Sequence, residues 1–166
     1  MNLRRIGIIH SPHQQAAGTP VQSALAAVVK GTVEVFPEYA GGLRDLDGFE
    51  RIWLVYWFDR ARASQLVVTP YLDTTPRGLF ATRAPCRPNP IGLSAVRLLG
   101  IAGNILEVDG LDILDNTPLL DIKPYIPEFD AFEAKRIGGA VMPRAVAGWR
   151  MAALRPAVAD EQPCTR

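Results

Sequence analysis

"LSAVRLLGIAGNILEVDG", residues 93–110, is the stretch that decides the fold. Apolar residues recur along both halves, and Gly103 with Asn104 separates them as turn residues separate the strands of a hairpin. The pattern predicts that a strand over Leu93–Ile101 turns back onto a strand over Ile105–Val108. A connection this short joins antiparallel strands, so antiparallel pairing is expected at the centre of the fold.

Short strand-like segments continue outward from this hairpin. The clearest is "RIWLVYWF", residues 51–58, which is rich in β-branched and aromatic residues. Good helix formers closed by glycine predict two short helices, Val21–Gly31 and Glu128–Gly139. Short strands without regular intervening helices indicate a mainly β fold, a barrel or a sandwich, and not a Rossmann fold. Further strands are predicted at Arg5–Ile9, Thr32–Phe36, Leu66–Val68 and Gly78–Thr82.

The composition is that of one globular domain, with 48% hydrophobic and 21% charged residues in a chain of 166. A net charge of +1 provides no overall attraction to nucleic acid or membrane. Any polyanion therefore has to be held by a local basic patch. Most of the 18 basic residues are arginines, which suits phosphate recognition but is equally what a genome rich in G and C produces.

The sequence also bears on location and on the boundaries of the domain. Cys86 and Cys164 lie far apart and indicate neither a disulfide framework nor a metal site, which favours a reducing cytoplasm. No apolar run approaches the roughly 18 residues of a membrane span, and Ile6–Ile9 is too short for a signal peptide. After Trp149 the periodicity is lost, so residues 149–166 are expected to form a tail behind a domain over residues 1–148.

A proline-rich loop, "RAPCRPNPIG" at residues 83–92, precedes the hairpin. Proline fixes φ and biases the residue before it toward extended geometry, so this loop loses little entropy when it orders. Such preorganisation suits a binding loop, in which Arg83 and Arg87 grip an anion or stack on a base while Asn89 presents an amide. The competing interpretation is a stiff connector with solvated arginines.

Two other loops carry polar side chains. "GLDILDNTPLLDIKPYIP", residues 110–127, holds three aspartates around an Asn-Thr-Pro turn. These carboxylates either accept hydrogen bonds from ribose hydroxyls or an ammonium group, or cap turns, and the spacing of a Ca²⁺ loop is absent. "HSPHQQAAGTPVQ", residues 10–22, is expected at the mouth of a pocket. Pro12 separates its two histidines and no third ligand is evident, so no metal is expected.

Several familiar catalytic motifs are absent from the sequence. There is no Walker phosphate loop, no nucleophile elbow and no G-x-G-x-x-G after a strand. Both histidines lie in one loop and no serine is placed with a base, so nucleophilic hydrolysis has no candidate apparatus.

Four long motifs resemble those of the TsaA-like family, whose characterised members are the TrmO S-adenosylmethionine-dependent tRNA methyltransferases. The family reads G-x-I-x-S-P, then an aromatic strand after G-L-x-x-L, then F-A-T-R with R-P-N-P-I-G, and finally L-D with D-G-T-P and D-I-K-P-Y. This chain has, in the same order between Ile6 and Pro127, "GIIHSP", "GLRDLDGFERIWLVYWFD", "GLFATRAPCRPNPIGLS" and "LDILDNTPLLDIKPYIP".

The resemblance implies a small TsaA-like β-barrel that binds S-adenosylmethionine and works as a cytoplasmic homodimer. The activity it implies is methyl transfer to N6 of threonylcarbamoyladenosine, next to the anticodon of tRNA. Some members carry an additional C-terminal domain, and the length of this chain implies the short form without it. Two alternatives stay open: a non-catalytic module that binds S-adenosylmethionine, and a methyltransferase with a small-molecule acceptor.

Motif positions in the family also assign the cofactor site. Three residues depart from the family pattern: Asp59 stands in place of histidine, Cys86 in place of phenylalanine and Asn116 in place of glycine. Asn116 tolerates positive φ almost as glycine does, so its turn is expected to survive. Gln22 matches a glutamine of the first loop. The residues expected to bind the cofactor are Pro12, His13, Gln14, Phe58, Asp59, Arg83, Leu93, Asp112, Leu114, Asp115, Thr117 and Pro118.

Methyl transfer from a sulfonium needs an aligned acceptor rather than a protein nucleophile. The exocyclic amine of adenine is a poor nucleophile, and hydrogen-bond acceptors on its N–H groups help it to react. Asn89 and Asp115 are the catalytic residues expected to supply such acceptors. The residues expected to contact tRNA phosphates are Arg87, Arg97, Arg136 and Arg144.

Overall fold

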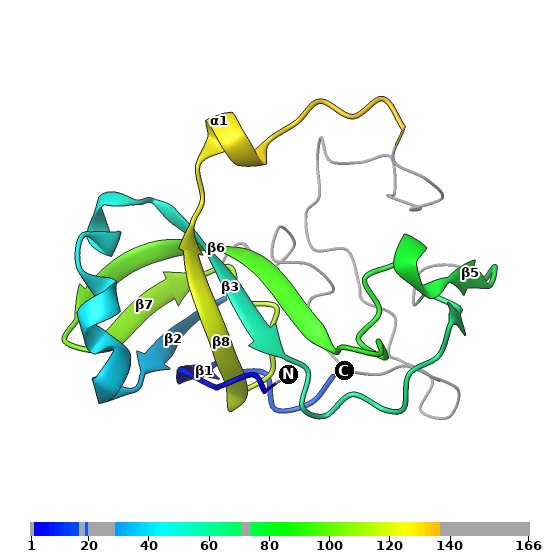
Figure 1. The fold of residues 1–166 in the computed structure, drawn as a ribbon, viewed down its shortest axis with the longest axis horizontal. Helices are drawn as coiled ribbons and strands as arrows, with labels where there is room; N and C mark the ends of the chain where they lie inside the picture. Colours follow the sequence, from blue (N-terminus) through cyan, green and yellow to red (C-terminus); the bar gives the residue numbers. More distant parts are fainter. Residues whose placement is uncertain (1, 17–18, 20–28, 71–73, 137–166) are drawn as a thin grey trace.

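A closed antiparallel barrel is the centre of the fold (Figure 1). It is seen in a computed structural model, which describes residues 2–16, 19, 29–70 and 74–136. The strands follow the order β1-β2-β7-β6-β3-β8, and β8 closes the barrel on β1. The expected mainly β architecture, a small barrel and not a Rossmann fold, is therefore confirmed. The strands are β1 (Gly7–His10), β2 (Lys30–Val35), β3 (Arg51–Trp57), β6 (Ile91–Ala102), β7 (Ile105–Asp109) and β8 (Thr117–Pro124).

The hairpin expected from the sequence is present as β6 and β7. Ala102 lies opposite Ile105, and Gly103 turns the chain with φ 63°. β6 is longer than expected and pairs with β3 along its first half and with β7 along its second half. The register shifts between Leu98 and Gly100, which lets this strand bend around a corner of the barrel.

Smaller elements lie outside the barrel. A two-stranded sheet is formed by β4 (Val67–Val68) and β5 (Arg77–Gly78), and Figure 1 shows β5 well away from the barrel. None of the helices in the described ranges is long or apolar enough to span a bilayer. The short helices are η2 (Pro37–Leu43), η3 (Leu46–Gly48), η4 (Leu79–Ala81) and α1 (Pro127–Asp130).

Two secondary-structure expectations in the central part of the chain are wrong. Of the strand expected over Gly78–Thr82, only Gly78 lies in a strand, β5. Leu79–Ala81 form η4 instead, and Oγ1 of Thr82 donates to the carbonyl of Leu79 at 2.8 Å. β8 is not predicted by the sequence, since its two prolines and its aspartate are typical of turns. It forms because alternate residues from Thr117 to Leu119 are buried in the barrel.

Neither expected helix is confirmed. Of the segment expected as helix over Glu128–Gly139, residues 128–136 are described, and among these only the end of α1 is helical; Ala131 after it is extended with φ −109°. Glu128, Phe129 and Asp130 keep no buried side chain, so packing does not prolong this turn. Residues 21–28 lie outside the described residues, and Lys30 and Gly31 belong to strand β2. The expected tail over 149–166 also lies outside them.

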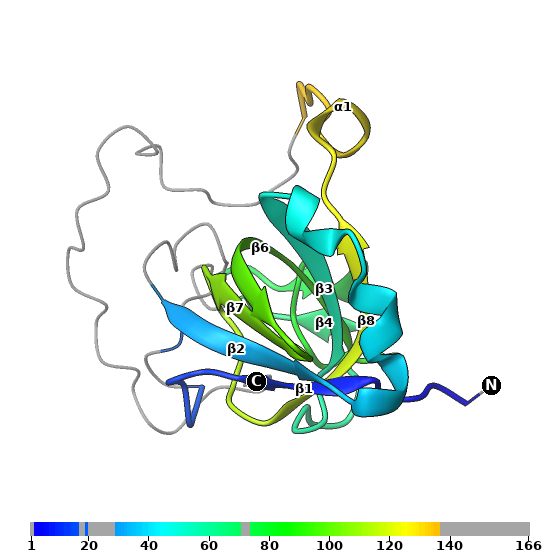
Figure 2. The same cartoon turned by 90° about the vertical axis from the view of Figure 1, so that its left-hand side faces the viewer.

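The core fills the interior of the barrel through the two-residue alternation of its strands. Leu43 of η2 and Leu46 of η3 join this core, and Figure 2 shows these helical turns packed beside the barrel. The buried residues of the barrel interior include Ile9, Val33, Val35, Ile52, Leu54, Tyr56, Val96, Leu98, Leu106, Val108 and Leu119.

Strand direction places four loops at one end of the barrel. Neighbouring strands are antiparallel, so the ends of β1, β3 and β7 meet the starts of β2, β6 and β8. The polar loop after β1, the residues after β3, the proline loop before β6 and the carboxylate turn before β8 therefore share this end. These are the loops in which the sequence places the candidate site.

Candidate functional site

Asp115 joins the carboxylate turn to the loop after β1. The backbone N–H of Ser11 donates to Oδ1 of Asp115 at 3.1 Å, and Nε2 of Gln14 donates to Oδ2 at 3.2 Å. In return, the backbone N–H of Asp115 donates to the carbonyl of His13 at 2.7 Å. These bonds cross about a hundred residues of sequence, so two of the motifs become one structural unit.

The turn that carries Asp115 is closed by its neighbours. Asn116 has φ 62°, in the left-handed region, which confirms that asparagine can stand where the family has glycine. Its side-chain amide donates to Oδ2 of Asp115 at 2.8 Å, and Oγ1 of Thr117 donates to the carbonyl of Leu114 at 2.7 Å. The direction of the Asp115 carboxylate is therefore set locally as well as by the first loop.

The charge of Asp115 is stabilised by these contacts. Burial alone would raise the pKa of the Asp115 carboxyl. Hydrogen bonds from the Gln14 side chain and from the backbone of Ser11 and Asn116, with the charge of the His10 ring, outweigh burial and lower that pKa below its usual value. Nδ1 of His10 lies 3.6 Å from Oδ1 of Asp115. The site thus holds a firmly ionised carboxylate.

Two further contacts bring the residues after β3 and the proline loop to the same place. Nη2 of Arg60 donates to the backbone carbonyl of Asp115 at 2.7 Å. The backbone N–H of Phe58 donates to the carbonyl of Pro90 at 2.8 Å, which ties the proline loop to the end of β3. All four sequence motifs therefore meet at one end of the barrel.

A buried polar chain runs from the core toward this site. The hydroxyl of Tyr56 lies 3.0 Å from Oγ of Ser94, and Ser94 donates to Oδ1 of Asp112 at 2.7 Å. Because serine has one hydroxyl hydrogen, Tyr56 is the donor in the first of these bonds. Gly92 makes room for the Tyr56 ring, since a Cβ at that position would overlap the ring atoms. The ring also packs edge-on against Phe58, with centroids 5.2 Å apart.

The enclosed space at this end of the barrel is small. A cavity of about 10 Å³ has room for about one water molecule. Among the described residues, this cavity is too small to enclose a larger molecule. The cavity is lined by Tyr56, Phe58, Asp59, Arg60, Ala61, Asp112, Ile113, Leu114 and Thr117.

The structure brings most of the expected cofactor residues together. Arg83 is exposed in the proline loop, Leu93 points outward from β6 and is 55% exposed, and Pro118 lies opposite Ile8 in β8. None of these three lines the cavity of the single chain. Gln22 lies outside the described residues. Phe58, Asp59, Asp112, Leu114 and Thr117 line the cavity, and Pro12, His13, Gln14 and Asp115 belong to the bonded loops beside it.

Sequence reasoning missed part of the site. Tyr56 belongs to the core, as its apolar strand indicates, and it also lines the cavity, a role that the sequence does not indicate. Ser94 and Arg60 are not singled out by any motif. The alternation of β3 and β6 does place Tyr56 and Ser94 on the inner face, and a buried polar residue on that face is the indication that would have found them.

The arginines expected to contact tRNA have different surroundings where the structure describes them. Nη1 of Arg87 points into its own loop and donates to the carbonyls of Thr82 at 3.0 Å and Ala84 at 3.4 Å. Arg97 pairs with Glu50 at 3.5 Å. Arg136 is exposed beyond α1, and Arg144 lies outside the described residues. The phosphate contacts remain predictions, and for Arg87 a role within the loop is established by its bonds.

The remaining departures from the family pattern have different surroundings. Asp59 lines the cavity. Cys86 is fully buried, and its carbonyl accepts a bond from the backbone of Gln65 at 3.2 Å. Among the described residues, no group of three or more His, Cys, Asp or Glu side chains has the arrangement of a metal site.

Fold and site together define a class: a small closed antiparallel β-barrel whose polar loops, the candidate site, gather at one end. A family model described as the tRNA-methyltransferase O N-terminal domain matches residues 8–131. The chain belongs to this family. It is 56% identical over 135 residues to a probable S-adenosyl-L-methionine-binding protein of Pyrococcus abyssi, covering 81% of this chain and 73% of that protein.

Other relatives are named as enzymes. The chain is 35% identical to the tRNA (adenine(37)-N6)-methyltransferase of Escherichia coli over 133 residues, which cover 74% of this chain and 57% of that protein. The crystal structure of TrmO from Pseudomonas aeruginosa matches with a TM-score of 0.70 and 38% identity, covering 84% of this chain and 62% of the other. The chain thus spans about three fifths of the length of each of these two proteins.

Proposed function

We propose that this chain is an S-adenosylmethionine-dependent methyltransferase that acts on N6 of an adenine in tRNA. The observation that carries the proposal is the meeting of all four family motifs around Asp115. Ser11, Gln14 and Arg60 bind this residue directly, and the bond between Phe58 and Pro90 adds the proline loop. The names of the relatives in Escherichia coli and Mus musculus support the same activity.

The chemistry of this end of the barrel suits the proposed cofactor. S-adenosylmethionine carries a positive sulfonium and an ammonium group, and carboxylates stabilise both. Asp59 and Asp112 line the cavity, and Asp115 lies beside it. Phe58 and Leu114 add apolar surface against which a nucleoside packs. When bound, the cofactor supplies the methyl group as an activated sulfonium, and this chain has to hold and orient it.

The two expected catalytic acceptors differ in their surroundings. Both oxygens of the Asp115 carboxylate accept hydrogen bonds from protein groups, and His10 lies close as well. A carboxylate offers about four lone-pair positions, so little capacity is left for a substrate. Asn89 is exposed in the proline loop, next to Pro90, which is bonded to Phe58. We therefore assign the acceptor to Asn89 and the positioning of the loops to Asp115.

The finer proposal names the acceptor nucleoside, threonylcarbamoyladenosine next to the anticodon. The test uses the purified chain with methyl-labelled S-adenosylmethionine and two forms of one tRNA. One form carries threonylcarbamoyladenosine and the other is an unmodified transcript. Mass spectrometry of the digested nucleosides is expected to show one added methyl group on the modified adenosine, and none in the transcript.

Each other outcome of this assay contradicts a different part of the proposal. Equal methylation of both tRNAs would overturn the threonylcarbamoyl specificity. Binding of S-adenosylmethionine in calorimetry without transfer to either tRNA would show a non-catalytic binding module. Transfer to a small nucleoside in preference to tRNA would show a small-molecule acceptor. A cytoplasmic location goes with the proposed tRNA substrate.

A homodimer is also proposed, from the outward face of β3 and β6. Trp57 and Ile91 are paired across these strands and are 42% and 40% exposed. Leu93 follows on the same face and is 55% exposed. A contiguous apolar stripe on the outside of a barrel is typical of an interface. Covering by a second copy would also bury Leu93, which the family motif places near the cofactor.

A further inference from the structure

The segment between β3 and β6 carries a net positive charge. Residues 60–90 contain five arginines, one aspartate and no lysine or glutamate, a net charge of +4; counted together with Asp59, which precedes them, the net charge is +3, whereas the whole chain carries +1. Figure 1 shows that β5, within this segment, lies apart from the barrel. A surface of this sign, next to the proposed site, attracts a polyanion.

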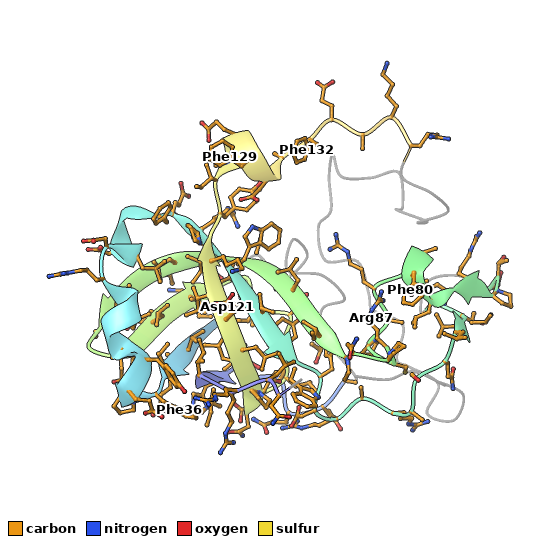
Figure 3. The ribbon with its side chains drawn as sticks, viewed as in Figure 1. Phe36, Phe80, Arg87, Asp121, Phe129 and Phe132 are labelled. Atoms are coloured by element: carbon orange, nitrogen blue, oxygen red, sulfur yellow. The ribbon has the colours of Figure 1, made fainter. Side chains whose placement is uncertain are left out.

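One aromatic side chain of this segment is presented to solvent. Phe80 lies on η4 and is 75% exposed. The guanidinium carbon of Arg87 lies over its ring, 5.6 Å from the centroid, within the range of a cation–π contact. Figure 3 shows the two side chains together, away from the barrel. One side of the ring is thus backed by a cation, and most of the ring surface faces solvent.

Arg87 is held in place for this contact. Its Nη1 donates to the backbone carbonyls of Thr82 at 3.0 Å, Ala84 at 3.4 Å and Leu79 at 3.5 Å. Leu79 precedes Phe80 within η4 and Thr82 follows η4, so Arg87 bonds to the chain on both sides of Phe80. An exposed ring fixed in this way loses little entropy when a ligand stacks on it.

The same loop connects Phe80 to the proposed catalytic end. The backbone N–H of Gln65 donates to the carbonyl of Cys86, and that of Phe58 donates to the carbonyl of Pro90. The prolines of this loop restrict its backbone further. A group bound at Phe80 is therefore held at a set position relative to Asn89 and the barrel mouth.

We propose that Phe80, seated on Arg87, is a stacking platform for an unpaired base of the RNA substrate. The proposal rests on the proposed function and names how that substrate is recognised. Single-stranded nucleic acid is bound by aromatic rings in positively charged surroundings, because every base has a π-face and each phosphate a charge. Residues 60–90 supply both features.

The positive charge around Phe80 favours stacking with a nucleic-acid base over a contact that any exposed aromatic ring could make. Phe129 is exposed to a similar extent, 70%, but its neighbours in α1 include Glu128 and Asp130. Figure 3 places it away from Phe80. Phe129 therefore serves as a matched control, an equally exposed phenylalanine in an acidic setting.

The experiment measures RNA binding, separately from methylation. Fluorescence anisotropy with labelled oligoadenylate and with an RNA hairpin that has an unpaired loop gives the Kd. Phe80→Ala is expected to raise Kd by about 5- to 100-fold. Phe80→Trp is expected to bind as tightly as the parent, and Phe129→Ala to leave Kd unchanged. A fully paired RNA duplex is expected to bind the parent and Phe80→Ala alike.

The outcomes distinguish this inference from its alternatives. Unchanged RNA binding by Phe80→Ala, with unchanged affinity for S-adenosylmethionine in calorimetry, overturns the platform. A lower oligomeric mass of Phe80→Ala in sedimentation shows instead that a second copy covers the ring, and also overturns it. If the parent methylates no tRNA, the proposed function is wrong. The RNA affinities of the parent and Phe80→Ala still test the stacking platform, because they are measured without methylation.

Discussion

Gly92 shows how one residue supports the polar chain behind the site. The Tyr56 ring occupies the space of a side chain at this position, and its hydroxyl reaches Ser94 and, through it, Asp112. Gly92→Ala forces a buried ring to move, so we expect a loss of about 1–3 kcal/mol in the free energy of unfolding. We also expect weaker binding of S-adenosylmethionine. Urea unfolding and calorimetry measure the two effects.

Gly100 provides the control, since it lies in the same strand and a Cβ there meets nothing within 4 Å. Gly100→Ala is expected to change stability by less than about 1 kcal/mol. Equal destabilisation by the two substitutions would mean that the cost arises from the β6 backbone and not from the displaced Tyr56 ring.

At the scale of elements, Asp115 holds the carboxylate turn and the first loop together. Its folded pKa is lowered, so its ionised form favours folding above the pKa of the unfolded chain, about 3.9. That contribution is lost as the pH falls through the lower folded pKa. We expect Asp115→Asn to be less stable than the parent by about 1–2 kcal/mol at neutral pH, and the difference to narrow in acid. Urea unfolding across pH 3–7 measures this.

Asp121 is the matched control for that series. It pairs with Lys123 at 2.7 Å on an exposed part of β8, where an ion pair contributes about 0–1 kcal/mol. Asp121→Asn is expected to follow the parent closely at every pH. A constant difference between the parent and Asp115→Asn at all pH values would contradict the role of the Asp115 charge.

At the scale of the whole molecule, the outward stripe of Trp57, Ile91 and Leu93 is expected to join two copies. Leu93→Asp places a charge in this stripe and is expected to shift the protein to monomers at micromolar concentration, because an unpaired charge is costly to bury. Sedimentation equilibrium measures the mass. Leu99→Asp, in the same strand and 42% exposed, is the control expected to keep the dimer. A parent that is monomeric at all concentrations would refute the dimer.

The elements that the sequence predicted are those with local patterns. The hairpin of β6 and β7 follows from alternation around Gly103 and Asn104, and β3 follows from its β-branched and aromatic run. β8 escaped prediction because prolines disfavour central strands, although Pro118 is accommodated at the start of the strand. The helix expected after Pro127 failed because no core contact extends it beyond Asp130.

The sequence by itself determined the mainly β class, the turn at Asn116 and, through resemblance, the set of motifs that make the site. These depend on neighbours in the chain, where alternation and turn chemistry act directly. Only the tertiary structure decided how the motifs meet. Asp115 bonds to Ser11 across 104 residues, Tyr56 reaches Ser94 across 38, and Arg87 turns inward beneath Phe80. Closure of the barrel brings these residues together, and local sequence patterns do not specify contacts between residues so far apart in the chain.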